Sequence, residues 1–186
     1  KKFCTSFSRS RLVVYMLAII QCRFNSYRLP GKALLKLSGD EILSRCVSRV
    51  KSANRVSNVL VATSKNKTDI PIVEFCKSKR IDVFIGSLGD VVQRLRDAAK
   101  SNNCKRFLRI CGDSPLIDPQ IIDHAISLSK ASEFDLVTNV FPRTFPKGQS
   151  VEIIKTSVLD RILNENRSTS QMEHPFSQLR TQKLIL

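Results

Sequence analysis

Short apolar runs alternate with segments of helical period along most of the chain. Runs rich in Val, Ile, Leu and Phe predict buried strands at residues 17–22, 58–63, 82–85, 105–111, 135–139 and 151–155. Apolar positions that recur at helical spacing predict helices at 40–53, 70–79, 90–100, 118–130 and 157–164. This alternation of strands and helices is typical of an α/β fold with a mostly parallel sheet.

Chain length and the apolar runs indicate the domain organisation. A chain of 186 residues is sufficient for one ordinary domain with a substantial core. We predict that residues 16–176 form this domain, that residues 1–15 are a basic extension outside it, and that residues 177–186 are an irregular end. The longest apolar run, residues 12–20, is far shorter than the roughly 20 residues of a membrane span. It therefore predicts a buried strand, and no membrane partner is expected.

The N-terminal extension permits two interpretations. Basic residues followed by an apolar run are similar to the start of a signal peptide, but no small-x-small cleavage pattern follows Ile20. The chain begins with Lys1, whereas Met16 stands directly before the first predicted strand. The extension is either upstream sequence or a targeting arm without acidic residues, and residue types do not separate the two.

Charge is the unusual feature of the composition. The chain has 31 Lys and Arg residues and 16 Asp and Glu residues, which gives a formal net charge of +15. An excess of this size favours anionic partners, from nucleotides to nucleic acids and acidic lipids. Nucleic-acid binding is the weaker prediction, because aromatic residues make up only 6% of the chain and no helix-turn-helix, zinc-finger or RNA-recognition motif is present.

The six cysteines are dispersed and form no C-x-x-C pair. Without such pairs or a cluster of His residues, a zinc site is not predicted. Several cysteines lie on apolar faces, where a free Cys behaves as a small hydrophobic residue. We therefore predict free thiols in a reducing, cytoplasmic setting.

Candidate chemistry is expected in the loops that follow the strands, because open parallel sheets bind ligands beyond the carboxyl ends of their strands. The loop after the first strand carries Arg23, Arg28 and Lys32, together with Pro30 and Gly31. Two interpretations are open: the cations wrap a polyphosphate, or the loop is a solvated basic segment. The loop matches neither the GxxxxGK[ST] nor the GxGxxG phosphate-binding pattern.

Two further loops carry weaker signals. Asp113 follows the fourth predicted strand, beside Gly112. A carboxylate there is well placed to hold Mg²⁺ on a substrate phosphate, since Mg²⁺ often takes only one or two protein carboxylates. Equally, Asp113 could simply cap the turn. Ala62 and Thr63, after the second strand, are candidates for contact with a base or ribose.

Taken in chain order, these segments resemble one family. The shared motifs are Arg23-x-x-Ser26-x-Arg28-Leu29-Pro30-Gly31-Lys32, Val61-Ala62-Thr63-Ser64, Gly86-Ser87, Asp90-Val91, Arg109-Ile110-x-Gly112-Asp113-x-Pro115-Leu116-Ile117-Asp118, Asn139, Pro142-Arg143-Thr144, Pro146-x-Gly148 and Glu173-His174. Their order and spacing resemble the sugar-nucleotide cytidylyltransferases. The branch of the spore coat polysaccharide biosynthesis protein F is nearest, and it is similar to the acylneuraminate and deoxy-manno-octulosonate cytidylyltransferases. The resemblance covers residues 17–176.

The resemblance implies a Rossmann-like, glycosyltransferase-A-like three-layer sandwich with a mostly parallel sheet. It further implies an enzyme that transfers CMP from CTP to a sugar or sugar acid and releases pyrophosphate, in the synthesis of a surface polysaccharide or glycoconjugate precursor. Mg²⁺ is the implied cofactor, CTP and the sugar are the implied partners, and a homodimer is compatible with the family.

The same resemblance implies roles for individual residues. The catalytic residues would be Arg23, Lys32 and Asp113. The nucleotide would contact Arg23, Ser26, Arg28, Gly31, Lys32, Ala62, Thr63, Gly86 and Arg109. The metal would bind Asp113 and Glu152, and the sugar would contact Asn139, Arg143, Glu173 and His174.

Departures from the family pattern keep two alternatives open. Where the family has Gly-x-Asp-x-Glu, this chain has Gly148-Gln149-Ser150-Val151-Glu152. Ser150 cannot supply a full negative charge to a metal or sugar, so activity could be impaired. The first alternative is a nucleotide-binding homologue without turnover. The second, less favoured, is a basic nucleic-acid-binding protein.

Overall fold

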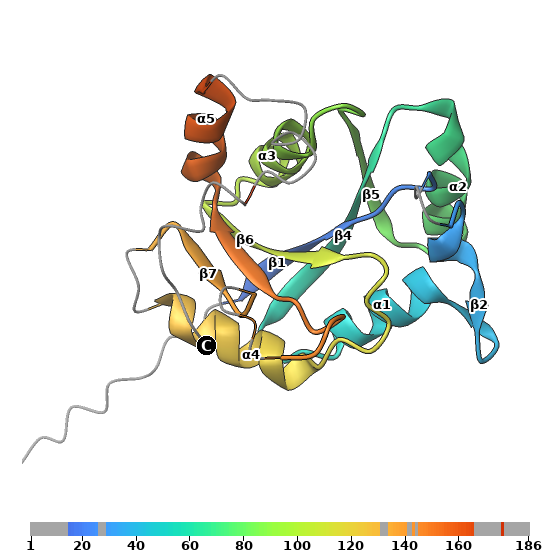
Figure 1. Ribbon diagram of the computed structural model, residues 1–186, viewed down its shortest axis with the longest axis horizontal. Coiled ribbons are helices and arrows are strands. Elements are labelled where there is room, and N and C mark those ends of the chain that lie inside the picture. Colours follow the sequence, from blue (N-terminus) through green and yellow to red (C-terminus); the bar gives the residue numbers. More distant parts are fainter. Residues whose placement is uncertain are drawn as a thin grey trace, which may run out of the picture.

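The computed structural model describes residues 15–25, 29–130, 134–140, 143, 145–165 and 176. Its centre is a six-stranded sheet with the order β5-β4-β1-β6-β8-β7 (Figure 1). The strands are β1 (Met16–Gln21), β4 (Val56–Ser64), β5 (Asp82–Gly86), β6 (Arg106–Cys111), β7 (Leu136–Thr138) and β8 (Glu152–Lys155). β5, β4, β1 and β6 are parallel, whereas β8 runs antiparallel to its neighbours β6 and β7. The expected mostly parallel sheet is confirmed. The expected N-terminal extension and C-terminal end lie, apart from Tyr15, outside the described residues.

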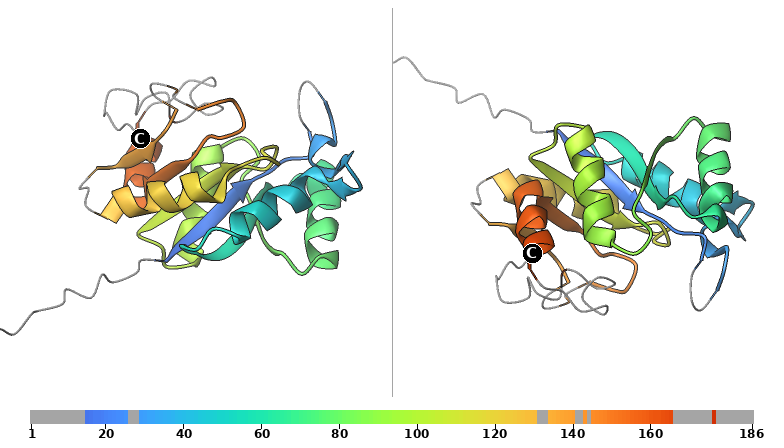
Figure 2. Two further views of the ribbon diagram at one scale, coloured as in Figure 1. Left: turned by 90° about the horizontal axis from the view of Figure 1, so that it is seen from below. Right: turned by 90° about the horizontal axis from the view of Figure 1, so that it is seen from above.

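Helices cover both faces of the sheet (Figures 1 and 2). α1 (Ile42–Lys51), α2 (Ile70–Ser78) and α4 (Pro119–Lys130) pack on one face, and α3 (Val91–Ser101) and α5 (Thr156–Asn164) pack on the other. β1 contributes to both apolar layers because successive side chains of a strand point to opposite faces: Ile20 joins the α1 layer and Ile19 the α3 layer. The three-layer α/β sandwich is therefore confirmed. None of the described helices has the length and hydropathy needed to cross a membrane.

A short hairpin precedes α1, where the apolar pattern predicts a helix from residue 40. β2 (Lys36–Leu37) pairs antiparallel with β3 (Asp40–Glu41), and α1 begins only after it. Ser38 and Gly39 have φ values of 50° and 92°, the positive φ that a two-residue hairpin turn requires. Arg45 of α1 donates to carbonyl oxygens of this hairpin and holds it against the helix. The predicted helix start is therefore wrong: α1 begins at Ile42 and not at residue 40, because Asp40 and Glu41 form β3.

The central strand β1 is the point where the winding of the sheet reverses. The chain passes from β1 through α1 to β4 and through α2 to β5, and then returns through α3 to β6 on the other side of β1. Where two neighbouring strands are followed by connections that diverge in this way, a crevice opens beyond their carboxyl ends. For β1 and β6 these ends are Gln21 and Cys111, which are partners in the sheet register.

The five cysteines in the described part of the chain are free thiols, and Cys22, Cys46 and Cys76 are buried. Cys4 lies outside the described residues. Burial raises the pKa of Cys46 to about 12 and the pKa of Cys76 to about 11, from an ordinary value of 9.0. Burial also raises the pKa of the Cys22 thiol.

These buried thiols should make the fold less stable in alkaline solution. Above a pH of about 9, a Cys in the unfolded chain releases its proton while the same Cys in the folded chain keeps it, so rising pH favours unfolding up to the folded-state pKa. Each such thiol removes about 1.4 kcal/mol from the free energy of unfolding per pH unit. We expect the urea midpoint to fall less between pH ~8 and pH ~10 in Cys46→Ala than in the wild type. Lysines that titrate in this range contribute equally to the fall in both proteins, so the difference between the two falls reports Cys46 alone. Equal falls would contradict the expectation.

Candidate functional site

Two loops touch where β1 and β6 end, toward the right of Figure 1. The N–H of Gly112 donates to the carbonyl oxygen of Gln21 at 2.9 Å, which joins the loop after β6 to the end of β1. A Cβ atom at position 112 would lie 2.9 Å from the Cβ of Cys22, closer than real side chains approach. Glycine at position 112 therefore allows the two loops to meet, and it sets the position of the next residue, Asp113.

A second glycine brings Lys32 to the same place. Gly31 has φ +72°, in the left-handed region that favours glycine, and its N–H donates to the carbonyl oxygen of Phe24 at 2.8 Å. The loop thus turns back on itself and continues into the short 3-10 helix η1 (Lys32–Leu34). As a result, Nζ of Lys32 lies 2.9 Å from Oδ2 of Asp113. The fold brings these two sequence-predicted residues into direct contact.

The Lys32–Asp113 pair is accessible, since 37% of the Lys32 side chain and 48% of the Asp113 side chain are exposed. An ion pair this exposed contributes at most about 1 kcal/mol to stability. The pair is better suited to binding a ligand than to stabilising the fold. The ammonium group of Lys32 can donate to phosphate oxygens, and the carboxylate of Asp113 can hold a divalent cation beside them.

Arg23, also expected at this site, is exposed in the loop after β1. Its charge contributes to lowering the pKa of Arg94 in α3. Ser26 and Arg28 lie outside the described residues. The described cations of this loop are therefore Arg23 and Lys32.

The expected nucleoside contacts lie at the ends of β4 and β5, on the opposite side of β1 from Asp113. Ala62 and Thr63 are fully buried in β4, and Gly86, at the end of β5, is half-buried. The hydroxyl of Thr63 has no hydrogen-bond partner among the described residues. Ala62 packs in the same apolar layer as α3. The three residues thus lie near the carboxyl edge of the sheet, but Ala62 and Thr63 lie inside β4 and not after it as the sequence analysis expects.

Arg109 and Glu152, expected at the nucleotide and at the metal, are bound to each other. They are partners in the register of β6 and β8, and Arg109 donates through Nη1 to the Glu152 carboxylate. Nε of Arg109 donates to Oε1 of Gln21 at 3.0 Å, and the ring of Phe176 lies 4.8 Å from the guanidinium carbon. Burial lowers the pKa of Arg109, but the charges of Glu152 and Cys111 and the hydrogen bond to Glu152 together raise this pKa above its ordinary value. Arg109 therefore neutralises Glu152 in this arrangement.

The two described sugar candidates differ in accessibility. Asn139 is 2% exposed; its side chain donates to the carbonyl oxygen of Gln149 at 2.7 Å and accepts the N–H of Val151 at 2.9 Å. It thereby holds the segment that leads into β8. Arg143 is exposed and donates to the hydroxyl of Ser150 at 3.2 Å. Glu173 and His174 lie outside the described residues.

The sequence analysis missed Asp69, which joins two loops of the site. Asp69 ends the short helix η2 (Lys67–Asp69) and is 1% exposed. One carboxylate oxygen accepts the N–H of Phe24 at 2.7 Å, and the other accepts the N–H of Ser64 at 3.1 Å. The loop that carries Arg23 is thus fixed to the end of β4. In the sequence, an Asp at the start of a helix looks like an ordinary cap, so no signal marked it.

Arg94 of α3 was also missed, although the sequence contains a signal for it. It is fully buried despite its charge. Arg94 is three residues after Val91 and four before Ala98, which places it on the same face of the helix as these buried residues. A single charged residue within an apolar stripe is the feature that could have revealed it.

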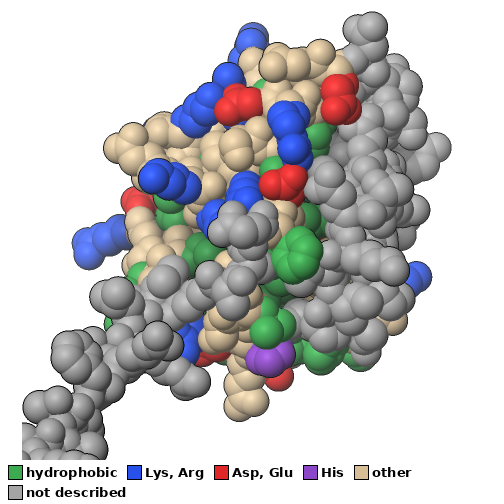
Figure 3. All heavy atoms as spheres, turned by 90° about the vertical axis from the view of Figure 1, so that its left-hand side faces the viewer, with side chains coloured by type: hydrophobic (Ala, Val, Ile, Leu, Met, Phe, Trp, Pro, Cys, Tyr) green, Lys and Arg blue, Asp and Glu red, His purple; other side chains and the backbone are tan. Residues whose placement is uncertain are grey.

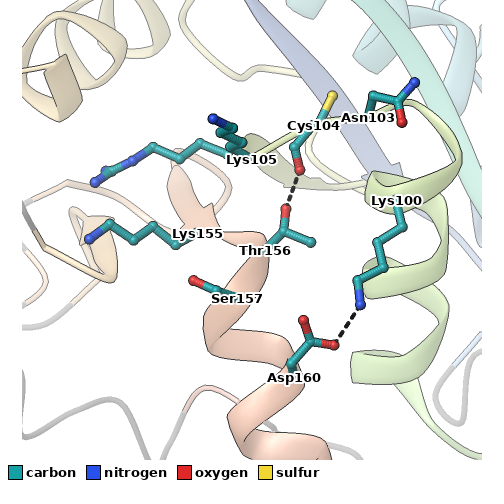
Figure 4. Close-up of a pocket in the computed structure, with 9 residues that line it drawn as sticks. Lys100, Asn103, Cys104, Lys105, Lys155, Thr156, Ser157 and Asp160 are labelled. Carbon is teal, nitrogen blue, oxygen red and sulfur yellow. Dashed lines mark hydrogen bonds and ion pairs between the residues drawn. The ribbon is translucent and has the colours of Figure 1, made fainter.

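A cavity of about 550 Å³ lies at the other end of the sheet, where β6 begins and β8 ends (Figure 4). Lys100 and Lys155 line it, and both are near carboxylates: Lys100 lies 2.9 Å from Asp160, and Lys155 lies 3.7 Å from Asp135. None of the sequence-predicted site residues in the described part of the chain lines this cavity. We therefore place the candidate site at the carboxyl ends of the strands and not here.

The described Lys and Arg side chains do not form a continuous basic surface on the face shown in Figure 3. On that face, the left-hand side of Figure 1, they are interspersed with Asp and Glu. Ion pairs such as Arg96–Asp160 and Arg161–Asp135 likewise place a cation beside a carboxylate. A mixed face of this kind differs from the basic stripe that is typical of nucleic-acid-binding domains.

Comparison with known proteins decides the family. The family profile described as "Cytidylyltransferase" matches residues 17–185. The chain belongs to the cytidylyltransferase family. This membership confirms the resemblance that the ordered motifs indicate.

Three curated proteins are similar to this member of the cytidylyltransferase family. An uncharacterized protein of Methanocaldococcus jannaschii is 33% identical over 159 residues, which are 86% of this chain and 64% of that protein. The spore coat polysaccharide biosynthesis protein SpsF of Bacillus subtilis is 29% identical over 150 residues, 77% of this chain and 60% of SpsF. A 3-deoxy-manno-octulosonate cytidylyltransferase of Pelobacter propionicus is 32% identical over 112 residues, 59% of this chain and 42% of that enzyme. The chain thus spans less than two-thirds of the length of these relatives.

Solved structures of cytidylyltransferases share the fold. A cytidylyltransferase from Leptospira borgpetersenii superimposes with a TM-score of 0.84 at 34% identity, covering 90% of this chain and 71% of that one. A CMP:2-keto-3-deoxy-manno-octonic acid synthetase complexed with CTP superimposes with a TM-score of 0.69 at 16% identity, covering 90% of this chain and 85% of that one. The second likeness is one of fold alone. Together they confirm the Rossmann-like fold of this member of the cytidylyltransferase family.

Proposed function

We propose that this chain transfers CMP from CTP to a sugar or sugar acid and releases pyrophosphate, in the synthesis of a surface polysaccharide or glycoconjugate precursor. The observation that carries the proposal is the contact between Lys32 and Asp113 where β1 and β6 end. It puts a cation for phosphate oxygens and a carboxylate for a divalent ion at the switch point of the sheet, where such folds bind nucleotides. Family membership supports the nucleotide chemistry.

In the proposed reaction, an oxygen of the acceptor attacks the α-phosphorus of CTP. A new phosphorus–oxygen bond forms, and the bond from the α-phosphorus to the oxygen shared with the β-phosphorus breaks. That oxygen leaves with the electron pair as part of pyrophosphate, and the attacking hydroxyl releases its proton to water. The protein contributes positioning and charge stabilisation. Arg23 and Lys32 hold the phosphate chain, with Lys32 nearest the charge that develops on the leaving group.

The residues fit a Mg²⁺ ion held through a single protein carboxylate. Asp113 is half-exposed and bonds Lys32 through one oxygen only, so it can still accept a metal ion. Mg²⁺ commonly binds one or two carboxylates, and water and substrate phosphates complete its coordination. When bound, the ion would neutralise charge on the triphosphate. Glu152 would first have to exchange Arg109 for the ion, because these two side chains are paired. In the described part of the chain, no three His, Cys, Asp or Glu residues are grouped as a metal site.

The class of acceptor is supported by two relatives and one side chain. SpsF is named for spore coat polysaccharide synthesis, and 3-deoxy-manno-octulosonate cytidylyltransferase is named for a sugar acid. Arg143 is exposed on the segment between β7 and β8, close to Ser150. Its guanidinium can pair with the carboxylate of a sugar acid.

Nucleotide binding without turnover is the second candidate. Ser150, whose hydroxyl accepts from Arg143, supplies no negative charge. Glu152, the nearby carboxylate, is occupied by Arg109. If Asp113 alone is insufficient to support the reaction, the chain will bind CTP without consuming it.

Two measurements separate these candidates. We expect CTP with Mg²⁺ to raise the melting temperature more than ATP, GTP or UTP at the same ionic strength. A nucleotide at 100 times its dissociation constant stabilises by about 2.7 kcal/mol, which corresponds to a shift of about 5–10 °C for a domain of this size. We further expect pyrophosphate release that requires CTP, Mg²⁺ and a sugar acid such as 3-deoxy-manno-octulosonate. Binding without release would favour the second candidate, and equal shifts with all four nucleotides would contradict a specific site.

A further inference from the structure

The first turns of α3 contain a buried guanidinium that the proposed reaction does not yet use. Arg94 is 0% exposed, and its helix neighbours Val91, Leu95 and Ala98 are apolar and buried. Buried Arg side chains are normally fully hydrogen-bonded, since an unpartnered buried donor loses its water without replacement. The bonding of Arg94 is therefore informative.

Among the described residues, only one nitrogen of the Arg94 guanidinium has a hydrogen-bond partner. Nη1 donates to the carbonyl oxygen of Ser87, in the turn between β5 and α3. Nε and Nη2 have no hydrogen-bond partner among the described residues. These two nitrogens form the edge of the guanidinium whose N–H bonds are parallel, the edge that binds pairs of adjacent acceptors. Ser87 thus anchors one side of the group, and a complete two-donor fork is left for another partner.

The protein around these two nitrogens is mixed in charge and closely packed. Burial and the charge of Arg23 lower the pKa of Arg94 to about 10, while Asp69 and Asp90 oppose this change. A Cβ at position 86 would lie 3.0 Å from Cγ of Arg94 and 2.8 Å from the ring of Phe84. Glycine at position 86 therefore lets the stem of Arg94 lie against the end of β5. The position needs a ligand that supplies acceptors.

The fork also lies on the side of the crevice where a base is expected. α3 follows β5 and packs in the same layer as Ala62 of β4, on one side of β1. The Lys32–Asp113 pair, which would hold the phosphates, lies between β1 and β6 on the other side. A nucleotide whose phosphates contact that pair can reach across β1 with its base toward the end of β5, against which Arg94 packs.

We propose that Arg94 recognises the N3/O2 edge of cytosine through Nε–H and Nη2–H, and so selects CTP over UTP. The inference rests on the proposed function, because it takes the ligand to be a cytidine nucleotide. Cytosine presents two adjacent acceptors, N3 and O2, which match two parallel donors. Uracil presents an N3–H donor in place of the first acceptor and would oppose the fork. The turn that contains Ser87 shifts to admit the base, since Arg94 has no exposed surface in the nucleotide-free protein.

The test measures nucleotide affinity by calorimetry without an acceptor, so it is independent of turnover. We expect the wild type to bind CTP about 10- to 100-fold more tightly than UTP, the discrimination typical of a two-point contact to a base. In Arg94→Met the affinity for CTP should fall by the same factor, so that the ratio approaches one. The melting temperature of the nucleotide-free variant should be unchanged or higher, because an unpartnered buried charge has been removed.

Arg96→Met is the matched control. Arg96 is on the same helix and carries the same charge, but it is partly exposed and bonds Asp97 and Asp160. It should keep the preference for CTP. Equal losses of CTP and UTP affinity in Arg94→Met would assign Arg94 to a phosphate, and an unchanged ratio would assign it a structural role; either result overturns the proposal.

A second measurement does not depend on the variant folding. The wild type should bind 3-deazacytidine triphosphate, in which a C–H replaces the N3 acceptor, at least about tenfold more weakly than CTP. Equal affinities would overturn the proposal. Failure of the proposed function gives a different pattern, in which this base preference is intact but no acceptor yields pyrophosphate.

Discussion

Replacing Lys32 by Ala is expected to lower CTP-dependent pyrophosphate release by at least about a hundredfold, because the ammonium group is held ready to meet charge on the leaving phosphates. Asp113→Asn is expected to act similarly through loss of the carboxylate. Neither change should lower the free energy of unfolding by more than about 1 kcal/mol, since both side chains are substantially exposed. Initial rates with saturating Mg²⁺ and urea denaturation test both halves of this prediction.

The double variant adds information that the single variants lack. Lys32 and Asp113 touch, so the loss in the double variant should be smaller than the product of the two single losses. Lys36→Ala is the matched control, because Lys36 is an exposed lysine of β2 with no part in the proposed site. Rates near the wild-type value in both single variants, or an equal loss in Lys36→Ala, would argue against the assigned site.

The second large effect concerns stability. Glu152→Gln is expected to cost about 3–5 kcal/mol, because it leaves the mostly buried Arg109 guanidinium without its counter-charge. Both side chains are mostly buried, with exposed fractions of 14% for Arg109 and 9% for Glu152. For a chain of this length the loss corresponds to a fall in melting temperature of about 10 °C. Differential scanning calorimetry measures it directly.

Two further variants show whether the cost comes from the unpaired charge. Changing Arg109→Met and Glu152→Leu together should recover much of the stability, since an apolar pair removes both charges. Asp160→Asn, which breaks the exposed pairs with Arg96 and Lys100, should cost less than about 1 kcal/mol. If Glu152→Gln melts at the wild-type temperature, the pair does not have the burial that we describe.

The element order could be predicted because its signals are local. α3 begins where an Asp caps it, with Asp90 accepting the N–H groups of Val92 and Gln93, and its apolar stripe has helical spacing. The hairpin before α1 could not be predicted from apolar spacing, because it depends on positive φ at Ser38 and Gly39. The antiparallel direction of β8 was also hidden, since a short apolar run carries no information about strand direction.

The candidate site could be predicted in part. The rule that ligands bind at strand ends places Lys32 and Asp113 in the same crevice, but their contact depends on the backbone approach at Gly112. The Arg109–Glu152 pair depends on the direction and register of β8, neither of which the pattern gives. The assigned roles in nucleotide, metal and sugar binding remain predictions. Arg94 could have been found, as a single charge in the apolar stripe of its helix.

The bonds of Asp69 have a kinetic consequence. The Asp69 carboxylate accepts the N–H of Phe24 in the loop after β1 and the N–H of Ser64 at the end of β4. It therefore joins the loop to the strand. A loop fixed to a central strand does not need to be ordered by each arriving nucleotide. Capture of the nucleotide should then be governed by diffusion and by the pull of the surrounding positive charge, and the association rate should fall as salt is added. In Asp69→Asn, loop ordering would become a separate, slower phase of binding that salt hardly changes.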